Sequence, residues 1–249
     1  MSDSAIWRPL RDELLRFAAA GRTANLWLRD DDAIEPTAPL DRLLDLTGNF
    51  AVPLALAVIP AVTGEALAMR LQRENRVAVI VHGWTHDNHA ADDRKKQELG
   101  PERPGPVVLA ELKAGFDKLK RLYPRQFTPV LVPPWNRIAP TLLPSLGDLG
   151  YRAVSVYGQS SAMSSIALVN SHVDIMNWHG VRGCRPHAEL VANLVTELAN
   201  RFDGGSEPIG VLTHHLVHDA AAWDFIAQLF EETKDSSAVG WRGIAELLN

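Results

Sequence analysis

The chain has 249 residues, of which 46% are hydrophobic, enough to bury a sizeable core in one large α/β domain or two small ones. Its formal net charge is -5 and it contains no long block of Lys or Arg, so charge gives no support for a nucleic-acid or anionic-membrane partner. The lone Cys184 cannot form an intrachain disulfide, and no segment is typical of a signal peptide or a membrane span. We expect a single-domain cytoplasmic protein without a membrane or nucleic-acid partner; the sequence carries no indication of its oligomeric state.

Short apolar, β-prone runs alternate along the chain with amphipathic stretches, which is typical of a parallel sheet with crossover helices. The predicted strands lie at residues 24–28, 53–59, 77–81, 128–132, 152–157, 172–176 and 209–213. The predicted helices lie at residues 6–19, 38–48, 63–74, 107–122, 140–149, 186–202 and 220–233. Residues 87–106 are polar, rich in charge and interrupted by Gly and Pro, so they are expected to form a long loop over one end of the domain.

Polar residues collect directly after five of these strands. The segments are "RDDD" (29–32), "HGWTH" (82–86), "PPWNR" (133–137), "NWH" (177–179) and "HHLVHD" (214–219). In α/β barrels and open parallel sheets the functional site assembles at the carboxyl ends of the strands. The sequence therefore predicts one site built from these segments.

The pair His82 and His86 has the spacing of two metal ligands. If the backbone turns helical after the strand, His-x-x-x-His places both imidazoles on one face. Two histidines and a carboxylate from Asp30, Asp31 or Asp32 would form an open site for a divalent metal. His89 lies beyond this spacing, in the polar loop, where we expect a role in loop structure or substrate contact.

Three adjacent aspartates at the end of a buried strand would repel one another without a cation or a partner such as Arg29. With a metal present, one aspartate can be a ligand while its neighbour acts as a general base. Strand alternation allows only one of His214 and His215 to face the same site, where it could act as a general acid. We expect His218 to belong to the start of the next helix.

In this order the motifs resemble those of the polysaccharide deacetylase family, carbohydrate esterase family four, whose fold is a distorted seven-stranded (β/α) barrel of parallel strands with outer helices. The resemblance extends from about residue 24 to 219. "RDDDA" is similar to the family's Asp-Asp pair, "HGWTH" to His-Ser/Thr-x-x-His, "VPPWN" to Arg-x-Pro-Tyr and "LTH" (212–214) to Leu-x-His.

The resemblance implies a metal-dependent hydrolase in which a metal-activated water attacks an acyl carbonyl. The implied metal ligands are His82, His86 and the second aspartate of the pair, with the first aspartate as the base and His214 as the acid. Arg29, Asp31, Asp32 and Ala33 match the related pattern Arg-x-Asp-Asp-small, so we expect Asp31 as the base and Asp32 as a ligand. The alternative register uses Asp30 and Asp31.

The chain departs from the family pattern at two motifs. Gly83 stands where the family has a hydroxyl residue, and Val132 or its neighbour stands where the third motif has an arginine that pairs with the catalytic aspartate. As a hypothesis, Arg29 or Arg137 takes over that role. Trp135 replaces the usual Tyr and, with Trp178, is expected to form an apolar wall for the acyl methyl or a sugar face. The other expected supporting or substrate-binding residues are Asp30, Pro134, Asn136, Asp174 and His215.

The function expected from the resemblance is removal of an acetyl or other small acyl group from an N-acylated sugar, small molecule or oligosaccharide. Two alternatives are a hydrolase of a non-sugar amide or ester, and a barrel that binds metal and carbohydrate without turnover. Zinc is the favoured metal, although two His and one Asp also suit Co, Ni or Mn. The sequence does not identify the substrate.

Overall fold

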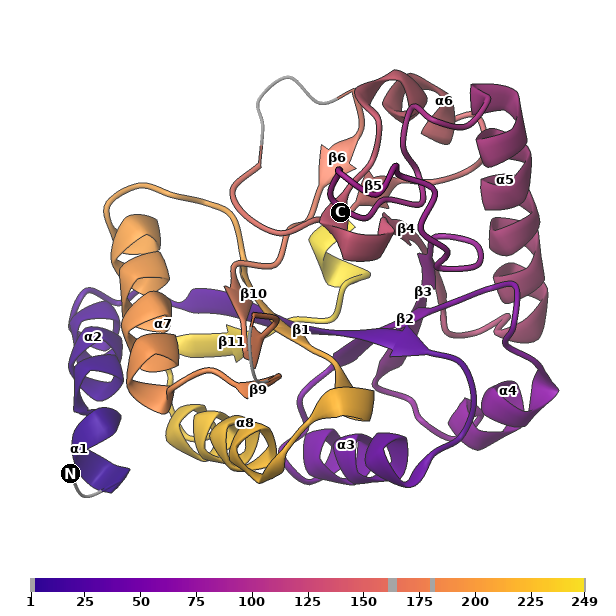
Figure 1. Ribbon diagram of the computed structural model, residues 1–249. Coiled ribbons are helices and arrows are strands. Elements are labelled where there is room, and N and C mark those ends of the chain that lie inside the picture. Colours follow the sequence, from indigo (N-terminus) through magenta and orange to yellow (C-terminus); the bar gives the residue numbers. More distant parts are fainter. Residues whose placement is uncertain (1–2, 161–164, 180–181, 249) are drawn as a thin grey trace.

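The computed structural model describes residues 3–160, 165–179 and 182–248, and its centre is one curled sheet of parallel strands (Figure 1). The strands of this sheet are β1 (Ala24–Ala33), β2 (Leu54–Val58), β3 (Val77–His82), β4 (Phe127–Val132), β5 (Ala153–Val154), β6 (Ala167–Leu168), β7 (Val173–Asp174), β10 (Ile209–Thr213) and β11 (Val239–Trp241). Two further strands, β8 (Met176–Asn177) and β9 (Gly183–Cys184), pair with each other in antiparallel fashion.

The sheet curls round on itself. Neighbouring strands follow the order β6-β5-β4-β3-β2-β1-β10-β7, and both ends of this path lie on the segment 167–174. The Ser171 backbone N–H donates to the Val156 carbonyl on one side, while the next residue, His172, donates to the Gly210 carbonyl on the other. With this segment counted as one strand, the expected distorted seven-stranded (β/α) barrel is confirmed, and β11 lies beside β1 as an addition.

Helices cover the outside of the barrel (Figure 1). They are α1 (Asp3–Ile6), α2 (Arg8–Ala19), α3 (Ala38–Asn49), α4 (Glu65–Leu71), α5 (Gly105–Leu122), α6 (Leu143–Leu146), α7 (His187–Phe202) and α8 (Ala220–Thr233). Short 3-10 turns are η1 (Pro134–Asn136), η2 (Pro140–Leu142), η3 (His215–Val217) and η4 (Glu246–Leu248). Side-chain caps begin two of the helices: Thr37 accepts from the Leu40 N–H before α3, and Asp219 accepts from the Ala222 N–H before α8.

Strand alternation divides the buried residues into two layers. Leu26 and Leu28 of β1 join the large core between sheet and helices, whereas Trp27 joins a smaller cluster inside the barrel. The inner cluster contains several small side chains, among them Ala55 and Ala57, because little space remains inside a narrow barrel. By the same alternation, Arg29 and Asp31 face the interior and Asp30 faces the helices.

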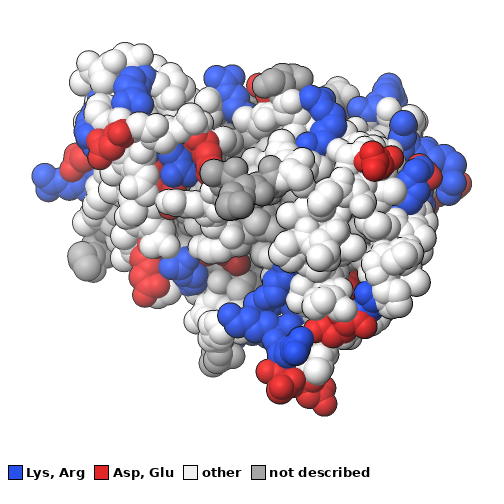
Figure 2. Space-filling view, turned by 90° about the horizontal axis from the view of Figure 1, so that it is seen from above, with Lys and Arg blue, Asp and Glu red and all other residues white. Residues whose placement is uncertain are grey.

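All of the predicted strands lie within or overlap observed ones, and the long loop before α5 is also present. The predicted helix 6–19 is interrupted at Trp7, and the predicted helix 140–149 is reduced to η2 and the four-residue α6. The strand β11 was not expected, because three residues are too few for alternation to show. Among the described helices none is long and apolar enough to cross a membrane. Figure 2 shows acidic and basic side chains in small, interspersed groups over one face.

Candidate metal centre and catalytic site

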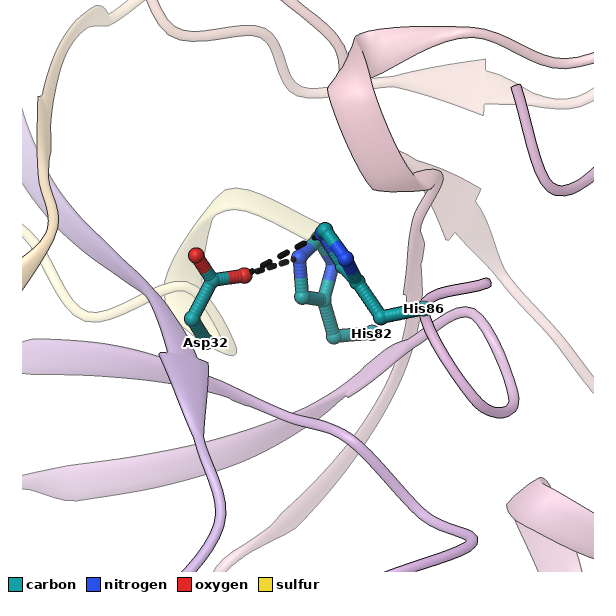
Figure 3. Close-up of side chains that lie close together, drawn as sticks. All are labelled: Asp32, His82 and His86. Atoms are coloured by element: carbon teal, nitrogen blue, oxygen red, sulfur yellow. Dashed lines mark hydrogen bonds and ion pairs between the residues drawn. The ribbon is translucent and has the colours of Figure 1, made fainter. Parts of the chain in front are cut away.

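Three side chains from the ends of β1 and β3 converge on one point (Figure 3). Asp32 Oδ1 lies 2.9 Å from His82 Nε2 and 3.3 Å from His86 Nε2. One ligand atom from each residue lies within 4.8 Å of the others. Asp32, His82 and His86 thus present one oxygen and two nitrogens to a common centre.

The backbone brings the two histidines together without a helix. The turn after β3 is not helical, since Gly83 has φ 54° and His86 has φ 65°, both in the left-handed region. Asp32 also has a positive φ of 72°. Such a conformation costs a non-glycine residue about 1–3 kcal/mol and persists only where surrounding contacts hold it. The strain at Asp32 and His86 therefore coincides with the candidate ligands.

The donor set fits a divalent metal. His82 is 2% exposed, and its Nδ1 donates to the Val132 carbonyl at 2.9 Å, which leaves Nε2 to face the centre. Burial lowers the pKa of His82, but the hydrogen bond and charge of Asp32 and the charge of Asp31 outweigh it and leave the pKa raised. Burial and the charge of His82 lower the pKa of His86, which favours a neutral imidazole there. Burial raises the pKa of Asp32, yet its contacts with the histidines leave it lowered and the carboxylate ionised.

Asp31 lies beside this centre and is held by Arg29. One ion pair and one hydrogen bond, each 3.0 Å long, join the two side chains, which are 3% and 0% exposed. The same guanidinium donates to Asn136 Oδ1 at 2.7 Å and to Ser155 Oγ at 2.8 Å. Arg137 lies elsewhere and donates to the Lys96 carbonyl. Of the two arginines considered from the sequence, Arg29 is therefore the one that contacts Asp31.

His214 approaches Asp31 from β10. Its Nε2 lies 3.9 Å from Asp31 Oδ2, and its ring forms a T-shaped contact with Trp178, with the ring centroids 4.6 Å apart. The Trp178 indole N–H donates to Asp174 Oδ2 at 2.8 Å. Burial raises the pKa of Asp174, against the effect of the His214 charge. Asp174 thus orients Trp178, which in turn packs on His214.

Asp30 and His215 pair with each other on the outer side of the strands. The His215 ring donates to Asp30 Oδ1, the Thr213 hydroxyl donates to Oδ2 at 2.7 Å, and neither Asp30 nor His215 exceeds 1% exposure. Burial opposes both charges, but their mutual attraction leaves the pKa of Asp30 lowered and that of His215 raised. This pair joins the end of β1 to the segment after β10, on the side of the strands that faces the helices. His218 follows η3 and accepts a hydrogen bond from the His214 N–H.

The remaining residues expected at the site are also placed. Trp135 packs on His86 with the ring centroids 4.4 Å apart, and Pro134 is buried beside Gly83. His89 is exposed, and its N–H donates to the Gln97 carbonyl within the loop.

Two partners were not identified from the sequence, Ser155 of the segment after β5 and Thr213 at the end of β10. Both are polar residues within the apolar runs predicted as strands at 152–157 and 209–213, a pattern that could have indicated them.

No protein-family model matches the sequence, and a comparison with curated proteins gives no match either. Solved structures do match. A Mycobacterium smegmatis protein described as a polysaccharide deacetylase has a TM-score of 0.67 at 15% identity, covering 92% of this chain and 90% of the other. A family 4 acetyl xylan esterase from Clostridium thermocellum, solved with cobalt, has a TM-score of 0.54 at 16% identity, with coverages of 90% and 89%. A CE4 family pseudoenzyme from Bacillus anthracis has a TM-score of 0.59 at 14% identity, with coverages of 91% and 66%. The chain therefore has the (β/α) barrel fold of the CE4 polysaccharide deacetylases.

Proposed function

We propose that the protein is a metal-dependent deacetylase that removes an acetyl or other small acyl group from an N-acylated sugar or a related amide. One observation carries the proposal: Asp31, fixed by Arg29 and 3.9 Å from His214, lies next to the convergent side chains of Asp32, His82 and His86. A base, an acid and a metal-ligand set close to one another are the elements that metal-dependent hydrolysis of an amide requires.

Asp32, His82 and His86 would hold the metal, with zinc favoured by two imidazoles and one carboxylate. When bound, it would supply Lewis acidity that activates a water molecule and polarises the acyl carbonyl. The cobalt in the acetyl xylan esterase structure supports a divalent metal in a barrel of this fold.

The other side chains have complementary roles. The Asp31 carboxylate accepts the proton from the attacking water, and Arg29 keeps that carboxylate facing the barrel interior. His214 Nε2 gives a proton to the departing amine, so that acetate and a free amine are the products. Trp178 and Trp135, which pack on His214 and His86, form the apolar wall against which the acyl methyl or sugar face lies.

Release of acetate from an N-acetylglucosamine oligomer tests the proposal. We expect the wild type to release acetate with zinc or cobalt present and to lose this activity with a chelator. His82→Ala and Asp31→Asn should also abolish release, while Asp41→Asn, a matched change at an aspartate that is paired with Arg70 on the surface, should not. Acetylated xylan run in parallel distinguishes the ester alternative.

One of the structural neighbours is a pseudoenzyme, which supports an alternative in which this protein binds metal but hydrolyses no substrate. Stoichiometric metal binding with no acetate release from the amide or the ester would establish a binding protein in place of the hydrolase.

A further inference from the structure

Glu98 is a buried carboxylate in an otherwise exposed loop. Most residues between 87 and 96 are exposed, yet Glu98 is 0% exposed and Leu99 is 1% exposed. The Ala139 N–H donates to the Leu99 carbonyl at 2.8 Å, which ties this part of the loop to the segment after β4. Glu98 therefore has a fixed place beside the candidate metal centre.

The Glu98 carboxylate accepts hydrogen bonds from three consecutive backbone N–H groups of the turn that carries His86. Oε1 accepts from the Trp84 and Thr85 N–H groups at 3.0 and 2.8 Å, and also from the Thr85 hydroxyl at 3.4 Å. Oε2 accepts from the His86 N–H at 3.3 Å. Hydrogen bonds to an ionised acceptor are about twice as strong as neutral ones. One side chain thus organises the whole turn between the two histidines.

Glu98 also occupies the space that a side chain at position 83 would fill. A Cβ atom added to Gly83 would lie 2.1 Å from Glu98 Oε2 and 2.6 Å from Pro134 Cγ. A hydroxyl residue at position 83 would therefore clash with the Glu98 carboxylate where it now lies. In this chain an acceptor from the loop stabilises a turn that has no side chain of its own at its first position.

We propose that Glu98 is a positioning residue for the metal centre, acting through the backbone of His86. His86 is in the left-handed region at φ 65°, and in that conformation of the turn its Nε2 lies 3.3 Å from Asp32 Oδ1. Without an acceptor, the three N–H groups are free to turn toward water and the strained residue relaxes. Loss of Glu98 then moves His86 away from Asp32 while His82, held by the Val132 carbonyl at the end of β3, stays in place.

Two substitutions at Glu98 and one control separate this role from a general effect on the loop. Glu98→Gln keeps the shape but presents one oxygen and one amide nitrogen, so it cannot accept from Trp84 and Thr85 on one atom and from His86 on the other. Glu98→Ala removes every acceptor. The control is Glu102→Gln, which changes a glutamate of the same loop that is paired with the exposed Arg94.

The inference rests on the proposed function, and its test uses cobalt binding by the full chain, followed by competition with a chelator and by the absorption spectrum of the bound cobalt. We expect Glu98→Gln to weaken binding about ten- to hundredfold, as loss of groups that orient metal ligands commonly does, and Glu98→Ala to weaken it further. Hydrogen exchange of the Trp84, Thr85 and His86 amides in the metal-free protein should accelerate in both variants. Glu102→Gln should leave affinity, spectrum and exchange as in the wild type.

Unchanged cobalt affinity and spectrum in both Glu98 variants would overturn the inference, even if exchange accelerates, because Glu98 would then stabilise the loop alone. Weakened binding in the variants together with a wild type that binds cobalt but releases no acetate would leave the inference standing and refute the proposed hydrolase. If the wild type binds no cobalt, the metal part of the proposed function fails. The inference is then decided by the His86 imidazole resonances of the metal-free protein, which must shift in Glu98→Gln and not in the control.

Discussion

Replacing Arg29 by Met should both destabilise the protein and abolish its activity. The guanidinium is fully buried, and it joins Asp31, Asn136 and Ser155, which come from three separate parts of the chain. Methionine fills a similar volume but provides no donor. The Asp31 carboxylate, itself 3% exposed, would then remain as a buried charge without its partner.

The expected loss of unfolding free energy follows from the unpaired charge of Asp31. Removal of one partner of a buried ion pair costs about 3–5 kcal/mol, a large share of the roughly 5–15 kcal/mol that stabilises a typical protein. Urea unfolding of Arg29→Met should show this loss of unfolding free energy. The double variant Arg29→Met, Asp31→Asn should regain part of it, because it has no unpaired charge buried at position 31. Arg29→Lys, which keeps the charge but cannot reach all three partners, provides a milder variant if Arg29→Met does not fold.

Arg137→Met is the matched control, because in the described part of the chain the hydrogen bond seen for the Arg137 side chain goes to the Lys96 carbonyl, away from Asp31. Its unfolding free energy and acetate release should stay close to those of the wild type. If Arg29→Met behaves like this control in both assays, or if Asp31→Asn destabilises it further, Arg29 is not the partner that supports Asp31.

Three further predictions concern separate parts of the molecule. Burial lowers the pKa of His218 to about 4, so the folded state binds this proton less readily than the unfolded chain does, and stability falls as the pH decreases from 6.5 to 4. His218→Gln should flatten the pH dependence of the unfolding free energy measured with urea in this window, by about 3 kcal/mol at most. A slope equal to that of the wild type would contradict the assignment. Trp178→Ala should lower kcat/KM about tenfold through lost packing on His214, with little change in unfolding free energy because the indole is 40% exposed; equal kinetics would remove Trp178 from the site. Gly210→Ala places a Cβ atom 2.6 Å from two backbone atoms of the neighbouring segment and should lower the free energy of unfolding by about 3 kcal/mol. Gly48→Ala in α3, where a Cβ atom would have nothing within 4 Å, should raise the free energy of unfolding by about 0.5–1 kcal/mol. Equal effects of the two glycine substitutions would show that the barrel does not close tightly at β10.

Much of the barrel could be predicted because its determinants are local in sequence. An apolar run such as residues 77–81 favours a buried strand, and the residue that follows it lies at the carboxyl end of that parallel strand. His82 was identified in this way, as were the aspartates after β1. The period of two along a strand also indicated that adjacent residues such as His214 and His215 face opposite sides.

The sequence by itself therefore determined which segments form strands, the end of the strands at which polar residues gather, and the short set of residues from which a site could be made. Only the tertiary structure decided which aspartate faces which partner. Asp30 pairs with His215, Asp31 with Arg29, and Asp32 with the histidines of β3, although the three are neighbours in the chain. The physical reason is that these partners come from other strands and loops, so their distances depend on how the sheet curls. Glu98 is the clearest case, because a glutamate in a polar loop has no local feature that shows it to be buried against the turn of His86.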